Sequence, residues 1–490
     1  MGAPTIEHGV ESGPRAAPPR VRPLVAWTAS GVIGAVGMVL TGTRIGSVPD
    51  PGHLLWWFSA PSGGAPLTSI FFYVSLAIVI VSWLGLGSEA RAGRLTVGWA
   101  WVVLGAWGLP FLVGPPLFSR DLYSYVAQGL IAHRGLDPYS VGPDVLGHGH
   151  LLSSVASVWR STPSPYGPLF VTASRWVATV SRSSLVVEVL AYRVLELAGV
   201  VLCMVFLPRL ARHLGTNPGV ALWLGVLSPL ALFSFVASGH NDALMVGLLV
   251  AGVSLAMERR LLLGLALCAL AASIKLPAVV GVVFVVANHV RASGGIIRWR
   301  AWVAAVTVPV VVFVGVTEVC GYGWTWLSPG ALHIPTELRV LSTPAVSLGV
   351  LAYQLLHLLG MPVARSGTVT AVQILCVLAT MIACAWLVLT VHRHEVVRSL
   401  GLALLVVVVG SPTLWPWYLM WGLVLLATTA AQASRALAAV AALAMVVVGP
   451  SGSPRLLGHA YLVVSAAAAA GVLWLVRGGR WRRVVSGHAG

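Results

Sequence analysis

The chain has 490 residues, of which 58% are hydrophobic and only 9% are charged, and its formal net charge is +16. So few charges exclude a soluble globular protein and predict an all-α polytopic membrane protein. Because arginines gather in the cytoplasmic loops of membrane proteins, the positive charge fits this class better than it fits a nucleic-acid binder.

Both ends of the chain differ from the rest. Residues 1–23 are polar and rich in proline, and they lack the apolar core of a cleavable signal peptide. We expect them to be a disordered cytoplasmic tail. Residues 24–477 are expected to form one transmembrane domain, and residues 478–490 a basic cytoplasmic tail.

Apolar runs long enough to cross a bilayer follow one another through the chain. The run at 261–290 has room for two short helices, with a break near Lys275 and Pro277. We expect about 13 or 14 transmembrane helices in all. The runs lie at 24–42, 68–86, 97–114, 184–207, 217–236, 243–257, 261–290, 301–319, 343–361, 369–391, 399–414, 417–431, 436–449 and 458–476.

Arginines orient these spans. They precede the first span and follow the second, fourth and sixth spans, which places those ends in the cytoplasm and the loop at 115–183 on the outer side. The alternation fails once, between the outer segment 321–342 and the basic segment 392–398. We therefore expect 343–361 to dip in and out on the outer side, or not to be a full span.

The outer loop at 115–183 is the longest extramembrane segment, and long loops in compact membrane proteins tend to carry function. Its first polar stretch places Asp121, Tyr125 and Gln128 on one helical face, with Leu122 and Val126 opposite. This pattern predicts an amphipathic helix on the membrane surface, with its carboxylate in water.

Further polar segments follow in the outer loop and at the predicted outer ends of spans. A second amphipathic segment is expected at 169–180, after a tight turn at 164–168. Chemistry is therefore expected on the outer face. The polar segments lie at 133–139, 164–168, 238–242, 273–277 and 411–418.

Asp121 is one of 14 acidic residues, and two roles are open for it. It could begin a helix and favour the positive end of the helix dipole. It could also be a general base that takes a proton from a hydroxyl. One carboxylate suffices for an inverting sugar transfer, because a leaving phosphate needs no acid.

Lys275 lies within an apolar run, where a buried ammonium costs about 2.5–3.5 kcal/mol. It could reach the interface, or contact the phosphate of a lipid-linked substrate. Arg193 and Glu196 could form an intramembrane ion pair. Trp415 and Trp417 fit an interfacial aromatic belt, with stacking on a sugar as the alternative.

His240, Asn241 and Asp242 could cap the span that follows them or bind a substrate. The five cysteines lie in or at the ends of apolar runs and lack metal-ligand spacing. We expect neither a metal nor another cofactor.

Several segments together resemble a known family. FSRDLYSYVAQGLIAHRGLDPY, SPYGP, SGHNDALMVGLL, SIKLPA, LSTP and SPTLWPWY are similar to segments of the actinobacterial polyprenol-phosphomannose-dependent α-1,6-mannosyltransferases, membrane enzymes of the GT-C superfamily. The resemblance runs from about residue 25 to residue 475. This chain departs from the plain GT-C pattern in having two spans, rather than one, before the span that carries the loop.

The resemblance implies a GT-C fold, a polyprenyl-phosphate-mannose donor and a glycolipid acceptor, with Asp121 as the essential acid of the outer loop. The product would be an α-1,6-linked mannan such as the lipomannan core, made at the outer face of the plasma membrane. The alternatives are another lipid-linked sugar, such as arabinofuranose, and a glycolipid transporter or flippase. The residues expected to bind substrate are Arg120, Tyr123, Tyr125, Gln128, Arg134, Asp137, Tyr166, His240, Asn241, Asp242 and Lys275.

Overall fold

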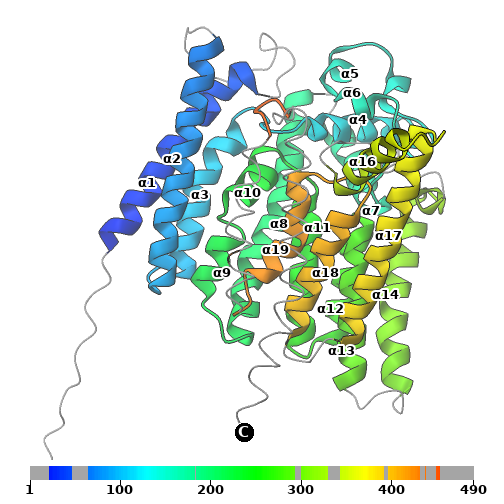
Figure 1. The fold of residues 1–490 in the computed structure, drawn as a ribbon. Coiled ribbons are helices and arrows are strands. Elements are labelled where there is room, and N and C mark those ends of the chain that lie inside the picture. Colours follow the sequence, from blue (N-terminus) through cyan, green and yellow to red (C-terminus); the bar gives the residue numbers. More distant parts are fainter. Residues whose placement is uncertain are drawn as a thin grey trace, which may run out of the picture.

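The computed structural model describes residues 21–46, 65–181, 184–292, 299–328, 343–390, 395–430, 436 and 448–452. The elements of secondary structure that the structure shows within these ranges are all helices, as the composition predicts. Figure 1 shows long helices that run roughly alongside one another, with a layer of short helices across one end. The expected tails lie outside the described residues, except that the first helix already begins at Val21.

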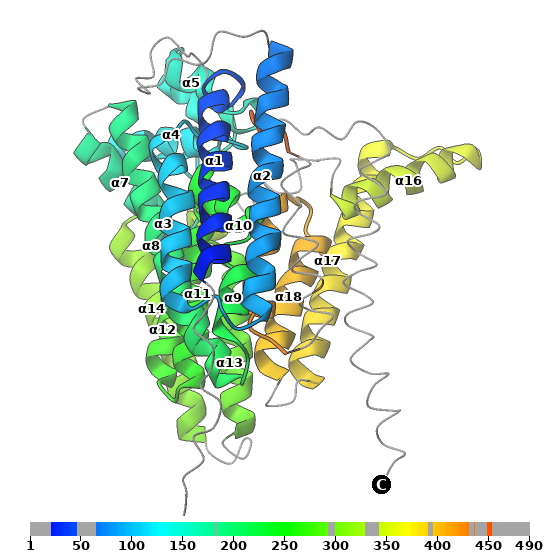
Figure 2. The same ribbon diagram turned by 90° about the vertical axis from the view of Figure 1, so that its left-hand side faces the viewer.

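Three helices form one side of the bundle, the side that faces the viewer in Figure 2: α1 (Val21–Ile45), α2 (Ala65–Arg91) and α3 (Val97–Val113). Two tryptophans connect this side to helix α9 (Pro218–Leu224). The rings of Trp83 and Trp223 stack with centroids 5.0 Å apart, and each indole N–H donates to the backbone carbonyl of the other residue. Both indoles are buried, so these paired bonds satisfy their N–H groups away from water.

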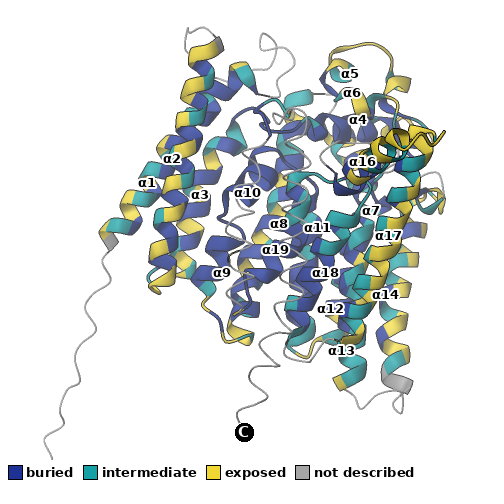
Figure 3. Cartoon of the chain, viewed as in Figure 1, coloured by how far each residue is buried: buried dark blue, intermediate teal, exposed yellow. Residues whose placement is uncertain are grey.

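The segment 115–181 forms the layer of short helices at the end of the bundle (Figure 1). The sequence predicts that its first helix, α4, lies on the membrane surface with its polar face in water, and this prediction is wrong. All of its residues except Leu130 and His133 are buried, Asp121 among them, and Figure 3 shows α4 coloured mostly as buried. The short helices that follow α4 cover the polar face that we expected in water. The layer comprises α4 (Asp121–His133), η1 (Pro143–Leu146), α5 (His150–Ser154), α6 (Ser157–Arg160) and α7 (Pro168–Ser181).

The middle of the bundle is built on α8 (Leu185–His213) and α11 (Asp242–Met257). Glycines let these two helices approach closely. A Cβ atom at Gly199 would lie 2.1 Å from the carbonyl oxygen of Ala243, and one at Gly247 would lie 2.3 Å from that of Gly199. Small residues at a crossing are the usual means by which membrane helices pack backbone to backbone.

Between α8 and α11 the chain runs through α9, α10 (Pro229–Ala231) and the π-helix η2 (Leu232–Ala237). This expected single span is bent by 52°. Arg193 of α8 holds the region together, because its guanidinium donates to the carbonyls of Leu112, Gly114 and Ala237. These three bonds join α8 to the end of α3 and to the end of η2.

The run at 261–290 is broken where the sequence predicts. Helix α12 (Leu261–Ala272) ends just before Lys275, the turn η3 (Leu276–Ala278) contains Pro277, and α13 (Val279–Ala292) follows. Helix α14 (Trp299–Cys320) and the turn η5 (Thr325–Leu327) come next.

The last described helices are α16 (Pro344–Leu358), α17 (Arg365–Thr390), α18 (Val396–Gly410), η7 (Pro416–Leu419) and α19 (Met420–Leu426). Helix α16 projects sideways from the upper end of α17 (Figure 2), so the apolar run at 343–361 does not run along the bundle as a full span would. This arrangement removes the conflict in the arginine pattern. The expected spans at 436–449 and 458–476 lie outside the described residues, apart from 436, 448 and 449.

Five described helices are long and apolar enough to cross a membrane, and the bent segment from Pro218 to Ala237 is a sixth candidate. Shorter apolar helices accompany them, among them α3, α11, α12 and α18. Many of their outward side chains are apolar, for example Ile70 on α2, Val310 on α14 and Ile382 on α17, which are more than half exposed. Such surfaces fit a protein embedded in lipid.

Candidate active site

The tight turn at 164–168 is joined by its backbone to the break between α12 and α13. The N–H of Gly167 donates to the carbonyl of Ile274, and the N–H of Leu169 donates to that of Ser273. A Cβ atom at Gly167 would lie 2.2 Å from the Ser273 oxygen, so only glycine fits this contact. Two polar segments that are far apart in sequence are thus fixed beside each other.

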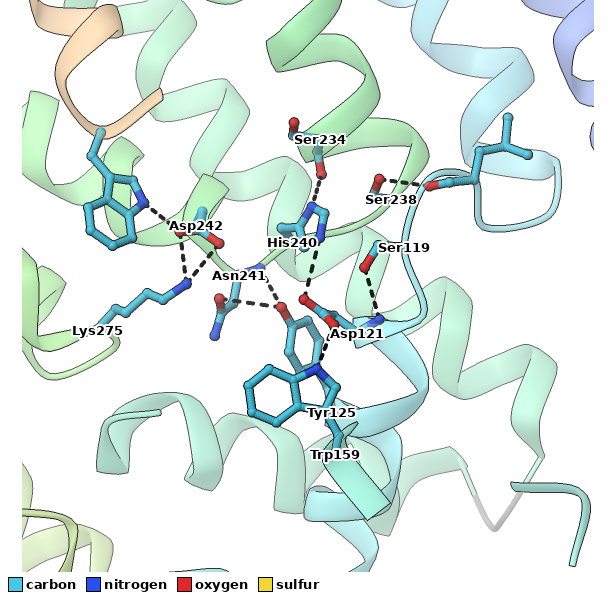
Figure 4. A network of polar contacts seen from close by, with 12 residues as sticks. Ser119, Asp121, Tyr125, Trp159, Ser234, Ser238, His240, Asn241, Asp242 and Lys275 are labelled. Atoms are coloured by element: carbon cyan, nitrogen blue, oxygen red, sulfur yellow. Dashed lines mark hydrogen bonds and ion pairs between the residues drawn. The ribbon is translucent and has the colours of Figure 1, made fainter. Parts of the chain in front are cut away.

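Asp121 begins α4, but its carboxylate does not cap the helix. The N-cap residue is Arg120, whose side chain makes no cap hydrogen bond, and the Ser119 hydroxyl accepts from the backbone N–H of Asp121 at 3.1 Å. The indole N–H of Trp159 on α6 donates to Asp121 Oδ1 at 3.0 Å, as Figure 4 shows. The Asp121 side chain is 13% exposed, and Oδ2 faces His240 at 3.6 Å. One oxygen is therefore held by a donor, and the other is turned toward a histidine.

Burial decides the protonation of Asp121. Removal from water raises its pKa to about 6, and the positive charge of Lys275 together with the Trp159 hydrogen bond limits that rise. A carboxyl with this pKa is mostly ionised at neutral pH and can still take up a proton, which suits a general base.

His240 lies in the turn between η2 and α11, where Gly239 has a φ of +70°. Its Nδ1 lies 2.9 Å from the carbonyl oxygen of Ser234, which is part of the π-helix. Because a carbonyl only accepts, Nδ1 carries the proton and the neutral ring presents a bare Nε2. Burial lowers the pKa of His240 to about 4, so the ring is neutral at physiological pH.

Asn241 and Asp242 start α11 without a side-chain cap bond. Asn241 lies 3.4 Å from the hydroxyl of Tyr125, through both Oδ1 and its backbone N–H. Asp242 accepts from the Lys275 ammonium at 2.9 and 3.0 Å and from the Trp421 indole at 2.5 Å. Lys275 thus finds a buried counter-ion rather than reaching the interface.

Aromatic rings surround the Lys275 ammonium. The centroid of Tyr418 lies 4.4 Å from Nζ, that of Trp421 lies at 5.4 Å and that of Tyr166 at 5.7 Å. Cation–π contacts of this kind stabilise a desolvated ammonium. Figure 4 shows one buried polar network that contains Asp121, His240, Asp242 and Lys275.

A pocket of about 260 Å³ opens beside Asp121 and gives this network an approach for a ligand. Its walls include Arg120, Asp121, Trp159, Trp415 and Trp417. The rings of Trp415 and Trp417 are stacked at an angle of 6° with centroids 5.0 Å apart, and Trp417 also stacks on His240 at 4.0 Å. A carboxylate, a guanidinium and aromatic walls in one hollow are groups that bind sugars and phosphates.

Comparison with known proteins shows the family of the chain. The family model "Alpha-(1->6)-mannopyranosyltransferase, N-terminal domain" matches residues 28–291, more than half of the chain, and "MptB C-terminal domain" matches residues 345–477. The chain belongs to the alpha-(1->6)-mannopyranosyltransferase family. It is therefore a membrane glycosyltransferase that transfers mannose, with a sugar donor and a sugar acceptor as its partners.

Individual relatives agree with the family model. Alpha-(1->6)-mannopyranosyltransferase A of Mycobacterium tuberculosis is 32% identical over 90% of this chain and 86% of its own length. A second alpha-(1->6)-mannopyranosyltransferase of that organism is 30% identical over 85% of this chain and 80% of its length. The Corynebacterium glutamicum enzyme named alpha-(1->6)-mannopyranosyltransferase A is 29% identical over 72% and 77% of the two chains. No solved structure matches the chain.

Not every residue expected to bind substrate lies at the pocket of this mannosyltransferase. Arg134 is exposed at the far end of α4, about 20 Å from Asp121 along the helix axis. Asp137 is used within its own turn, where it accepts from the Tyr139 N–H and the Ser140 hydroxyl. Neither residue lies in the wall of the pocket, and Asp137 stabilises its own turn.

Three other expected residues are buried around the network. Tyr123 is fully buried on α4, and because it is two residues from Asp121 it points to another side of the helix. Gln128 accepts from the Ser164 hydroxyl at 3.0 Å, which secures the 164–168 turn. The ring of Tyr166 packs against that of Tyr125 at 5.2 Å.

Two tryptophans that sequence reasoning did not identify contact the site: Trp159 contacts Asp121, and Trp421 contacts Asp242. Trp417, for which stacking on a sugar was the alternative to an aromatic belt, stacks on His240. A tryptophan near a membrane end fits an interfacial belt equally well. Among the described residues no group of three or more His, Cys, Asp or Glu side chains could hold a metal ion.

Proposed function

We propose that the mannosyltransferase moves mannose from a polyprenyl-phosphate donor onto the 6-hydroxyl of a mannose in a glycolipid-linked mannan, such as the lipomannan core. The observation that carries this proposal is the Asp121 carboxylate, which lies in the wall of a sugar-sized pocket with only one oxygen held by Trp159. Oδ2 is then available to accept a proton from a sugar hydroxyl.

The proposed reaction is a single displacement. The acceptor hydroxyl gives its proton to Asp121 Oδ2 while its oxygen bonds to the anomeric carbon of the donor mannose. The bond from that carbon to the phosphate oxygen breaks, and the electron pair leaves with the polyprenyl phosphate. A β-linked donor then gives an α-linked product, because attack comes from the face opposite the leaving group. No general acid is required.

Arg120 is placed to assist the departing phosphate. It is a half-buried cation in the pocket wall, next to Asp121 in the chain. A guanidinium binds phosphate through paired hydrogen bonds. A contact between Lys275 and the phosphate stays a prediction from the sequence, and it requires the ion pair with Asp242 to open. We therefore assign the first phosphate contact to Arg120.

An apolar cavity between α12, α13 and α14 supports a lipid-linked donor. Its volume is about 460 Å³, and its walls include Val279, Val283, Val306, Val310 and Phe313. Ala272 and Val279, which flank the break that carries Lys275, are in the walls of the cavity. An isoprenoid chain has the apolar character that this cavity accommodates.

The proposed reaction takes place on the extracytoplasmic side of the plasma membrane. Helices α2, α8, α11 and α13 run away from the α4–α7 layer (Figures 1 and 2), and their far ends carry Arg91, Arg209, Arg212, Arg259 and Arg291. Under the positive-inside rule this arginine-rich end faces the cytoplasm. The α4–α7 layer and the pocket then face outward.

Reconstitution tests the donor and the linkage. Proteoliposomes receive an α-1,6-mannoside acceptor with either polyprenyl-phosphate-[¹⁴C]mannose or GDP-[¹⁴C]mannose. We expect label in α-1,6 linkage from the lipid donor alone. Transfer from the nucleotide donor, or from polyprenyl-phosphate-arabinose at an equal rate, would refute the donor assignment.

Val283→Trp, which fills the apolar cavity, should raise the KM for the lipid donor.

Two arginines of the outer layer form a matched pair of variants. Arg120→Ala should lower kcat/KM at least tenfold, because it removes the pocket cation. Arg134→Ala lies at the far end of α4 and should change kcat/KM less than twofold. Equal losses in both variants would remove the phosphate role from Arg120.

Cysteine labelling tests the orientation. Ser153→Cys in α5 and Ala92→Cys in the α2–α3 turn are both exposed positions, introduced in a chain whose native cysteines are replaced. A membrane-impermeant maleimide added to intact cells should label position 153 and spare position 92. The reverse pattern would contradict an outward-facing site.

A further inference from the structure

His240 places its Nε2 atom, a hydrogen-bond acceptor, next to the Asp121 carboxylate, and no hydrogen bond joins the two groups. Its Nε2 is buried without a hydrogen-bond partner among the described residues, and the side chain is 0% exposed. Nε2 lies 3.6 Å from Asp121 Oδ2. This separation is longer than a hydrogen bond, as expected for two atoms that both carry lone pairs.

The orientation of this ring is fixed from two sides. The Ser234 carbonyl accepts from Nδ1, so the ring cannot exchange its tautomer without losing that bond. Trp417 stacks on the ring face with centroids 4.0 Å apart. Ser234 lies in the π-helix η2, a type of helix that often occurs at functional sites. These two contacts fix the ring at Nδ1 and at its face and leave Nε2 free of them. The lone pair of Nε2 therefore stays directed toward Asp121.

The geometry points to His240 as a positioning residue that strengthens Asp121 as a base. This inference rests on the function proposed above. When Asp121 is ionised, the Nε2 lone pair and the Oδ2 anion repel each other. When Oδ2 has taken the proton from the acceptor hydroxyl, the new O–H can donate to Nε2. The contact thus changes from repulsion to a hydrogen bond as the proton is transferred.

The proton balance of this step is simple. The acceptor hydroxyl loses one proton, Asp121 Oδ2 gains it, and His240 accepts a hydrogen bond without gaining charge. The proton stays on the carboxyl until the products leave, and it then passes to water. An interaction that forms only as the proton arrives lowers the barrier without tightening substrate binding.

Other groups around Asp121 also shift the pKa of its carboxyl. Lys275 and the Trp159 indole favour the ionised carboxylate, whereas Asp242 disfavours it. Arg120 precedes Asp121 in the pocket wall. His240 is the neighbour that changes from an unfavourable to a favourable contact on protonation, so its removal should make Asp121 a weaker base.

A series of substitutions at His240 tests the inference. His240→Asn can keep the bond to the Ser234 carbonyl through its amide but is too short to reach Asp121. His240→Phe keeps the ring that stacks on Trp417 and lacks both nitrogens. His240→Gln extends an amide oxygen toward the Nε2 position, where it can accept from a protonated Asp121. The probe is polyprenyl-phosphate-mannose with an α-1,6-mannoside acceptor, and kcat/KM is measured from pH 4.5 to 8.

We expect the Asn and Phe variants to move the acidic limb of the profile about one pH unit lower and to reduce kcat about tenfold, with the acceptor KM nearly unchanged. The Gln variant should restore most of both. Loss of activity with an unmoved limb, or equal behaviour of Gln and Asn, would overturn the inference. Gel filtration in detergent checks that each variant is folded.

The same assay separates this inference from the proposed function. If Asp121→Asn keeps full activity, the base assignment itself is wrong. If Asp121→Asn is inactive and the His240 variants leave the limb in place, only the role of His240 is wrong.

Discussion

The ammonium of Lys275 lies 2.9 Å from the carboxylate of Asp242, in the interior of a bundle that otherwise buries mainly apolar side chains. The Trp421 indole completes the coordination of that carboxylate. Burying two charges is costly, and the attraction between them offsets that cost only while both partners are present. The pair therefore couples the break after α12 to the start of α11, the elements that place His240 and Lys275.

Removing one partner of this pair should destabilise the protein more than removing both. Lys275→Met leaves a bare buried carboxylate, which typically costs about 3–5 kcal/mol. Combining it with Asp242→Asn removes the uncompensated charge and should recover much of the loss. Thermal unfolding in detergent, followed by tryptophan fluorescence, measures both variants. A double variant that is less stable than Lys275→Met would contradict this account.

The rate should fall below about pH 6, because burial raises the pKa of Asp121 to about 6 and only the ionised carboxylate can accept a proton. Trp159→Phe removes the donor that stabilises the carboxylate, so it should raise that pKa and move the acidic limb to higher pH. The direction is opposite to that expected for His240→Asn. A limb that moves the same way in both variants would show that the two contacts are misassigned.

Gly167→Ala should disrupt the contact between the 164–168 turn and the α12–α13 break. The added methyl carbon would lie 2.2 Å from the Ser273 oxygen, so one of the two backbones must move. Gly105→Ala in α3 is the matched control, since nothing lies within 4 Å of its Cβ position. We expect a lower melting temperature and lower activity for Gly167→Ala only. Equal melting temperatures would show that the turn adapts freely.

Sequence reasoning reached the class of the fold because that class depends on composition and run length. The break near Lys275 and Pro277 was correct for a local reason, since proline ends a helix and a lone ammonium disfavours a continuous apolar one. The arginine pattern also showed that 343–361 could not be a full span if the segments on either side keep their expected orientation. The sideways course of α16 that resolves this conflict depends on packing against α17, which no local pattern encodes.

The site was predicted in part. Asp121 and the 238–242 segment were identified from polar residues at the ends of apolar runs, and they do lie together. The burial of α4 was missed because η1, α5 and α6 are too short to show a periodicity, and the amphipathic pattern of α7 does not tell which helix it packs on. Trp159 was missed, and stacking on a sugar was only the alternative for Trp417, because a tryptophan near a membrane end fits an interfacial belt as well as a binding site. Arg134 was grouped with Asp121 because the two are near in sequence, but it lies at the opposite end of α4.

The most direct test of the central claim is mannosyl transfer by Asp121→Asn in proteoliposomes. Asparagine has the same shape and can still accept from the Trp159 indole, so the pocket should stay intact. Without a base at this position, kcat should fall by about 10²–10⁴, while the gel-filtration profile of the variant matches that of the wild type. Transfer at the wild-type rate would show that Asp121 does not take the proton from the acceptor hydroxyl.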